Sequence, residues 1–263
     1  MVARAALHMW EEPCISGEEG SGTVFFSGCN LGCVYCQNRK IAGGAVGRTV
    51  TAEQLAQMYL ELQNQKANNI NLVTAGHFLP DVVASVRMAK QGGLQIPIVY
   101  NTSSYEWAEA IAALQETVDI FLPDLKYLSP ELAKRYSRAE NYPEIAKKAI
   151  AQMVRQTGEP VFDQRGILQK GVIVRHLVLP GYVEESKRVI RYLYETYGDT
   201  VYISIMNQYT PMAGVEKQYP ELGRKITQEE YDEVVDYAID LGVENGFIQE
   251  GDTADESFIP DFL

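Results

Sequence analysis

The feature that most constrains the fold is a repeated order in which an apolar run is followed by an amphipathic helix. Six runs rich in Val, Ile, Leu and Phe occur along the chain, beginning at Gly22, Asn69, Ile96, Val118, Gly171 and Thr200. Strands of a parallel sheet that is buried on both faces have near-continuous apolar sequences of this kind. Alternation of such strands with helices predicts parallel strands joined by right-handed crossovers.

Capping signals mark where the helices between these runs begin and end. Three pairs match the capping-box pattern, in which Ser or Thr precedes Glu or Gln by three positions: Thr51 and Gln54, Ser103 and Glu106, Thr227 and Glu230. Ser129 with Pro130 predicts another helix start, and a helix is expected from Pro143 to Arg155. Glycines follow several of the predicted helices, at Gly92, Gly158, Gly198 and Gly242.

Six strand–helix units are too few for a closed eight-stranded barrel. The sequence therefore predicts an α/β fold, a partial and open (β/α)6 barrel, with a flat doubly wound sheet as the alternative. We expect one domain, with an N-terminal extension over residues 1–21, a barrel core over 22–249 and a tail over 250–263. In either architecture ligands bind beyond the carboxyl ends of the strands.

The charge balance of the chain restricts its partners. The chain has 35 acidic and 23 basic residues and a formal net charge of −12, a balance that repels nucleic-acid phosphates and anionic lipids. No apolar run is long enough to cross a bilayer, and the N-terminus lacks the apolar middle of a signal peptide. We therefore expect a cytoplasmic protein that binds neither nucleic acid nor membrane.

Three of the chain's four cysteines, Cys29, Cys33 and Cys36, fall within eight residues. In a reducing compartment, clustered cysteines more often bind metal or react than form disulfides. A structural zinc site needs four ligands, and the chain's three histidines are isolated. A Cys-x-x-Cys redox pair would leave Cys29 unexplained. Cubane clusters usually take four thiolates, so three favour an iron–sulfur cluster with one iron free of protein ligands.

The segment CNLGCVYC, with Tyr35 before the last cysteine, resembles the cluster motif of the radical S-adenosylmethionine (radical SAM) superfamily. The resemblance covers most of the chain. It narrows to the group of the pyruvate formate-lyase activating enzyme on the segments LVTAGHFLP, IVYNTSSYE, LPDLKY, IVRHLVLPG and MNQYTP. It implies the radical SAM type of open barrel.

The resemblance also implies an activity. Cys29, Cys33 and Cys36 would hold a [4Fe–4S] cluster whose open iron binds S-adenosyl-L-methionine. One electron, supplied by a flavodoxin or ferredoxin, would cleave the cofactor to methionine and a 5′-deoxyadenosyl radical that abstracts hydrogen. The expected substrate is a glycine of a glycyl-radical enzyme. A small molecule or peptide is the alternative substrate, and a cluster-binding sensor without turnover is a third reading.

Residues that follow the second and third strands match positions where relatives bind the cofactor. Thr74-Ala75-Gly76-His77 replaces a Gly-Gly-Glu segment, so His77 either takes over from the missing carboxylate or is a histidine at a helix entry without a ligand role. Asn101, Ser103 and Ser104 lie where relatives hold the ribose and carboxylate. Helix capping is the alternative role for these residues.

Later strand ends supply the remaining candidates. Asp124 and Lys126 resemble an Asp-Leu-Lys segment near cofactor and substrate, with a plain ion pair as the alternative. Arg175 and His176 are adjacent in a strand, so they point to opposite faces, and we expect His176 in the cavity. Gln208 is expected to contact adenine or substrate.

Two features lie outside this pattern. Cys14 is either a substrate-site thiol or, as free cysteines more often are, a small buried apolar residue. The acidic tail contains Phe258, Ile259 and Phe262, apolar residues that predict docking of the tail across the open side of the barrel.

Overall fold

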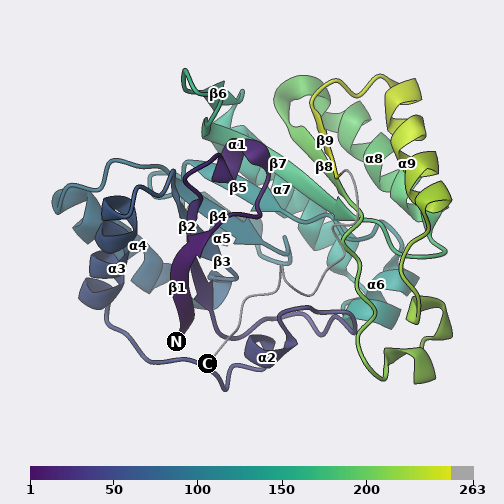
Figure 1. The fold of residues 1–263 in the computed structure, drawn as a ribbon, viewed down its shortest axis with the longest axis horizontal. Coiled ribbons are helices and arrows are strands. Elements are labelled where there is room, and N and C mark those ends of the chain that lie inside the picture. The colour runs from purple at the N-terminus through teal and green to yellow at the C-terminus, as the bar shows by residue number, and fades with distance from the viewer. Residues whose placement is uncertain (250–263) are drawn as a thin grey trace.

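A mostly parallel, open sheet forms the centre of the molecule (Figure 1). The computed structural model describes residues 1–249, and the predicted docking of the tail through Phe258, Ile259 and Phe262 falls outside them. The strands are β1 (Val2–His8), β2 (Ser21–Phe26), β3 (Ile70–Val73), β4 (Ile98–Thr102), β5 (Ile120–Pro123), β6 (Val161–Phe162), β7 (Leu168–Leu177), β8 (Tyr202–Met206) and β9 (Gly246–Ile248).

The strand order excludes the flat doubly wound alternative. Strands β2, β3, β4, β5, β7 and β8 are neighbours in the order of the chain, all parallel, without the reversal of a doubly wound sheet. The described strands β1 and β9 form the two ends of the path and do not pair with each other. These six strands are the six predicted runs, and the prediction of an open α/β barrel is confirmed.

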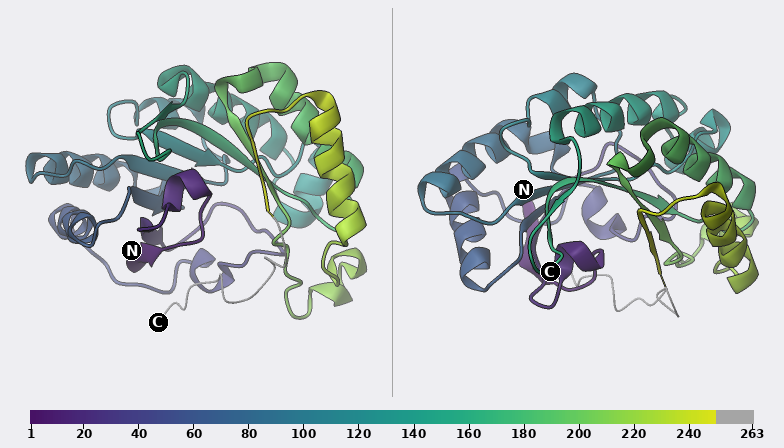
Figure 2. Two further views of the ribbon diagram at one scale, coloured as in Figure 1. Left: turned by 45° about the horizontal axis from the view of Figure 1, so that its top comes forward. Right: turned by 90° about the horizontal axis from the view of Figure 1, so that it is seen from above.

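Helices cover the outer face of this curved sheet (Figure 2). The described helices are α1 (Pro13–Ser16), α2 (Arg39–Ala42), α3 (Ala52–Asn64), α4 (Leu79–Gln91), α5 (Ala108–Ala112), α6 (Pro130–Ser137), α7 (Tyr142–Thr157), α8 (Val183–Tyr197) and α9 (Gln228–Leu241). Of these, α1 and α2 lie outside the outer layer. Among the described residues, no helix is both long and apolar enough to span a bilayer.

Two of the three predicted capping boxes are present. Thr51 caps α3 and Thr227 caps α9, each with the reciprocal bond from the third residue of its helix. The box predicted at Ser103 is wrong, because α5 begins at Ala108 with Trp107 in the capping position. The side chain of Glu106 instead binds the end of β4. It accepts hydrogen bonds there from the hydroxyls of Tyr100, at 2.8 Å, and Thr102.

The N-terminal extension contributes the strand β1 and the short helix α1. β1 pairs antiparallel with β2, and the short helix α1 covers the end of the barrel interior. Cys14 and Ile15 of α1 pack there with Val99 of β4 and Ile173 of β7. Cys14 is buried, and burial raises the pKa of its thiol to about 12, so it fits the apolar role.

Candidate active site

The loop that follows β2 is fixed by backbone hydrogen bonds on both sides. Gly28 and Cys29 donate their amides to carbonyls of α2, at 2.9 and 3.0 Å. Gly28 has φ of +102°, a conformation that strongly favours glycine. On the other side, the amides of Gly32 and Val34 bond to the last turn of α6, at 3.1 and 2.8 Å. The loop therefore has a defined shape before any ligand binds.

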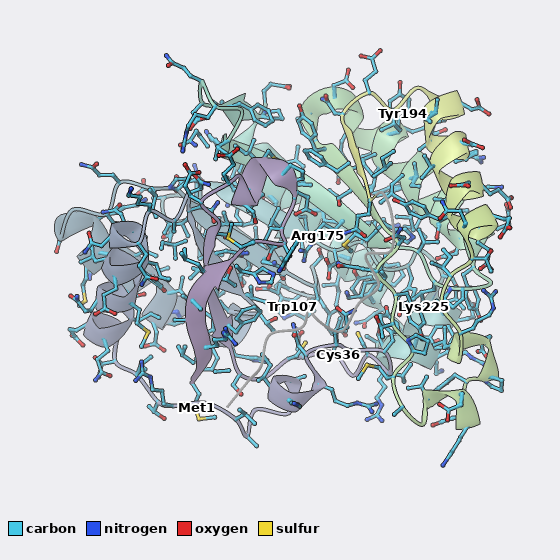
Figure 3. All side chains as sticks on the ribbon, in the orientation of Figure 1. Met1, Cys36, Trp107, Arg175, Tyr194 and Lys225 are labelled. Carbon is cyan, nitrogen blue, oxygen red and sulfur yellow. The ribbon has the colours of Figure 1, made fainter. Side chains whose placement is uncertain are left out.

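All three thiols of this loop line one cavity of about 260 Å³. Cys36 and Arg175 both line this cavity, and Figure 3 labels them in the middle of the molecule. The Sγ of Cys33 lies 3.0 Å from the Oγ of Ser137 in α6. That hydroxyl belongs to a chain with Tyr127, at 3.1 Å, whose own hydroxyl lies 2.5 Å from that of Tyr35. Tyr35 is therefore held in place beside the last cysteine.

The chemistry of these sulfurs suits a bound cluster. Burial raises the pKa of Cys33, and burial together with the neighbouring thiols raises that of Cys36 to about 11. Without a cation the thiols of Cys33 and Cys36 stay protonated, and metal binding must supply the charge that keeps these two as thiolates. Within residues 1–249 no three Cys, His, Asp or Glu side chains converge on a single ion. A cubane binds each thiolate at a different iron, so the sulfurs need not converge.

Most of the predicted strand-end residues meet in the same cavity. Its walls include Tyr35, Thr74, Asn101, Ser103, Asp124, Lys126 and Gln208. They come together because parallel strands bring their carboxyl ends to one side of the barrel. Thr74 has φ of +59°, which is strained for a β-branched residue and is retained mainly at functional sites.

Asp124 is the centre of a buried charge network. It accepts from Lys126 Nζ at 2.7 Å and from Arg175 Nε at 3.1 Å. Burial opposes the charged form, but these two cations outweigh it, so the pKa of Asp124 is lowered. Burial alone would lower the pKa of Lys126, yet the Asp124 carboxylate raises it. Both side chains therefore stay charged at neutral pH.

The N-terminal extension adds a second carboxylate to this network. Glu11 lies 3.2 Å from Arg175 Nη1 and accepts from Asn71 at 2.9 Å. Arg175 Nη2 also donates to Asn101 at 2.6 Å, so its guanidinium joins β4, β5 and the extension. Burial raises the pKa of Glu11 despite the nearby arginine. Glu11 could not be predicted as a site residue, because no sequence pattern linked residues 1–21 to the strand ends.

The prediction that His176 faces the cavity is wrong. Arg175 lines the cavity, whereas His176 points toward the helix layer. Its Nδ1 lies 2.7 Å from the Leu125 carbonyl and its Nε2 lies 2.9 Å from Ser186 of α8. Burial lowers the pKa of His176, which favours the neutral ring. His176 thus joins β7 to its crossover helix.

Gly76 and His77 line a neighbouring cavity of about 250 Å³, which shares Thr74, Thr102 and Ser103 with the first. A Cβ added to Gly76 would lie 2.9 Å from Glu106 Oε2. The carboxylate that comes closest to this segment is therefore Glu106, from the loop after β4. Because the sequence pattern predicted Glu106 as part of a capping box, its position beside Gly76 was not foreseen.

Comparisons with known proteins agree with this geometry. Residues 23–193 match the family model of the radical SAM superfamily. The chain is 27% identical over 239 residues to an uncharacterized protein of Methanocaldococcus jannaschii, covering 88% of this chain and 65% of that protein. The chain thus spans less than two thirds of this relative.

Solved structures show the same fold. Streptococcus suis SuiB bound to S-adenosylmethionine matches 87% of this chain and 50% of its own, with a TM-score of 0.55 and 11% identity. SuiB bound to its precursor peptide SuiA gives a TM-score of 0.54 at 11% identity, over 87% of this chain and 48% of its own.

Proposed function

Because this chain belongs to the radical SAM superfamily, we propose that it binds a [4Fe–4S] cluster and cleaves S-adenosyl-L-methionine reductively. The observation that carries the proposal is the placement of Cys29, Cys33 and Cys36 around one cavity whose other wall is formed by polar strand ends. When bound, the cluster and cofactor together supply the electron and the carbon radical that abstracts a hydrogen atom.

The chain's own residues then have defined tasks. The three thiolates hold the cluster, and Thr74, Asn101 and Ser103 offer hydrogen bonds to the polar groups of the cofactor. Lys126 uses one bond for Asp124 and can direct its other ammonium hydrogens into the cavity, close to Cys33. Gln208 is the proposed contact to adenine or substrate, at the end of β8.

We propose a glycine of a glycyl-radical enzyme as the substrate, on the likeness of the strand-end segments to the activating enzymes. A small molecule or peptide is the second candidate. SuiB, which has the same fold, was crystallised with a precursor peptide, and this favours a peptide among such substrates. In either case the electron donor is proposed to be a flavodoxin or ferredoxin.

The test uses anaerobically reconstituted protein with dithionite and S-adenosyl-L-methionine. We expect methionine and 5′-deoxyadenosine from the wild type and neither product from Cys33→Ala, which loses one cluster ligand. A wild type that carries its cluster but forms neither product, with or without candidate substrates, would refute the proposed cleavage. A glycine-centred doublet in the electron paramagnetic resonance spectrum, after addition of a glycyl-radical enzyme, would support the proposed substrate. Absence of the doublet across such enzymes would contradict it.

A further inference from the structure

Residues 20–52 contain no Asp or Glu, although 35 of the chain's 263 residues are acidic. This segment includes the loop with the three cysteines. It also carries Arg39 and Lys40, the first two residues of α2, and both are exposed. This segment therefore carries a net positive charge, whereas the net charge of the whole chain is −12.

A third exposed cation reaches the same loop from α6. Arg138 follows the last turn of α6, and its aliphatic part packs on Gly32, so that a Cβ added to Gly32 would lie 2.8 Å from Arg138 Cδ. Arg39 Nη2 donates to the carbonyl of Val34 at 3.4 Å. Gly32 and Val34 precede and follow Cys33 in the sequence, so each of the two arginine side chains contacts a residue next to this cysteine.

Among residues 1–249 no ion pair neutralises the charges of these side chains. Nearby basic residues of α6 are paired, Lys134 with Glu140 at 2.9 Å and Arg135 with Glu221 at 2.6 Å. In the described part of the chain Arg39, Lys40 and Arg138 have no carboxylate within ion-pair distance. Figure 1 shows α2 and α6, which carry or precede them, in the lower half of the molecule. We call Arg39, Lys40 and Arg138 the basic patch.

We infer that the basic patch is the docking surface for a small acidic protein that carries one electron. The inference rests on the proposed function, because the patch matters for electron entry only if Cys33 binds the cluster. One electron passes from the carrier, which is oxidised by one electron, to the cluster, which is reduced from the 2+ to the 1+ state. No proton or bond changes in this step. A polyanion such as nucleic acid would meet the acidic remainder of the surface, whereas a small acidic protein can contact the patch alone.

The test compares two charge-reversal variants with the same change in net charge. One carries Arg39→Glu, Lys40→Glu and Arg138→Glu. The control carries Arg87→Glu, Lys148→Glu and Lys170→Glu, three exposed cations of α4, α7 and β7. Cluster-loaded proteins are mixed anaerobically with a fully reduced flavodoxin, and the bleaching of the cluster is followed by stopped flow. The milder pair Lys40→Gln and Arg138→Gln guards against a folding defect.

We expect the patch variant to be reduced about tenfold or more slowly at low ionic strength, because steering by opposite charges speeds encounter by about 10- to 1,000-fold. The Lys40→Gln, Arg138→Gln pair should fall between it and the wild type. The control should stay within about twofold of the wild type, and the differences should shrink at 1 M salt, where the Debye length is about 3 Å. Dithionite, which needs no docking, should reduce all variants alike.

Equal rates for the patch variant and the wild type, or equal slowing of patch and control variants, would overturn the docking surface while leaving the proposed function intact. If the patch variant instead loses only the response to a glycyl-radical enzyme, the patch binds the substrate protein and the inference is wrong. Failure of dithionite to reduce the wild-type protein would refute the proposed function, and the docking surface with it.

Discussion

At the scale of single residues, Arg175 is the cation that links the two buried carboxylates of the cavity, Glu11 and Asp124. Its guanidinium contacts Glu11, Asp124 and Asn101, and only 14% of its side chain is exposed. Removing one partner of a buried ion pair leaves the other charge without compensation, which is far more costly than losing an exposed pair.

We therefore expect Arg175→Met to lower the free energy of unfolding by about 3–5 kcal/mol. Adding Glu11→Gln to that variant should recover part of the loss, because one uncompensated carboxylate is then neutral. Urea unfolding measures both effects, with Lys170→Met, an exposed change on the same strand, as a control expected within about 0.5 kcal/mol of the wild type. An Arg175→Met variant as stable as the control would contradict this account of the network.

The sequence could identify the cysteines but not the orientation of β7. The spacing of Cys29, Cys33 and Cys36 is itself informative, whereas β7 is buried on both faces and shows no apolar–polar alternation. Which of Arg175 and His176 faces the cavity depends on the position of Asp124, the carboxylate that pairs with the arginine, and the sequence does not show that position.

At the scale of elements, capping patterns predicted the starts of α3 and α9 correctly. They failed at α5, where the side chain expected to cap the helix has hydrogen-bond partners on a strand. The capping boxes of α3 and α9 formed as predicted. Glu106 does not cap a helix, because its carboxylate accepts hydrogen bonds from the hydroxyls of Tyr100 and Thr102 at the end of β4. β1 was not predicted as a strand, since Val2–His8 is a partly exposed edge strand without a continuous apolar run.

These caps allow a direct comparison. Thr51→Ala and Thr227→Ala should each lower the free energy of unfolding by about 1 kcal/mol, because each removes the acceptor for a free amide of the first helical turn. Ser103→Ala should change it by less than about 0.5 kcal/mol, since Ser103 caps no helix. Chemical denaturation of the three variants measures this. A loss at Ser103 as large as that at Thr227 would show that the helix boundary of α5 is misassigned.

At the scale of the whole molecule, the order of the strands along the chain determines where the site forms. Consecutive parallel strands place their carboxyl ends on one side of an open barrel, and this general rule brought ten of the predicted residues to one cavity. The substrate could not be predicted in the same way. One fold serves proteins that act on different substrates, and the N-terminal extension reaches the site only in the folded chain. Cytoplasmic location and the division into extension, core and tail stay predictions.

The central claim is that Cys29, Cys33 and Cys36 hold a cubane cluster. The most direct test is the iron and acid-labile sulfide content of protein that is prepared and reconstituted without oxygen. We expect about four iron and four sulfide per chain in the wild type, as in a [4Fe–4S] cluster, and much less in Cys33→Ala. Zinc in place of iron, or iron without inorganic sulfide, would contradict the account.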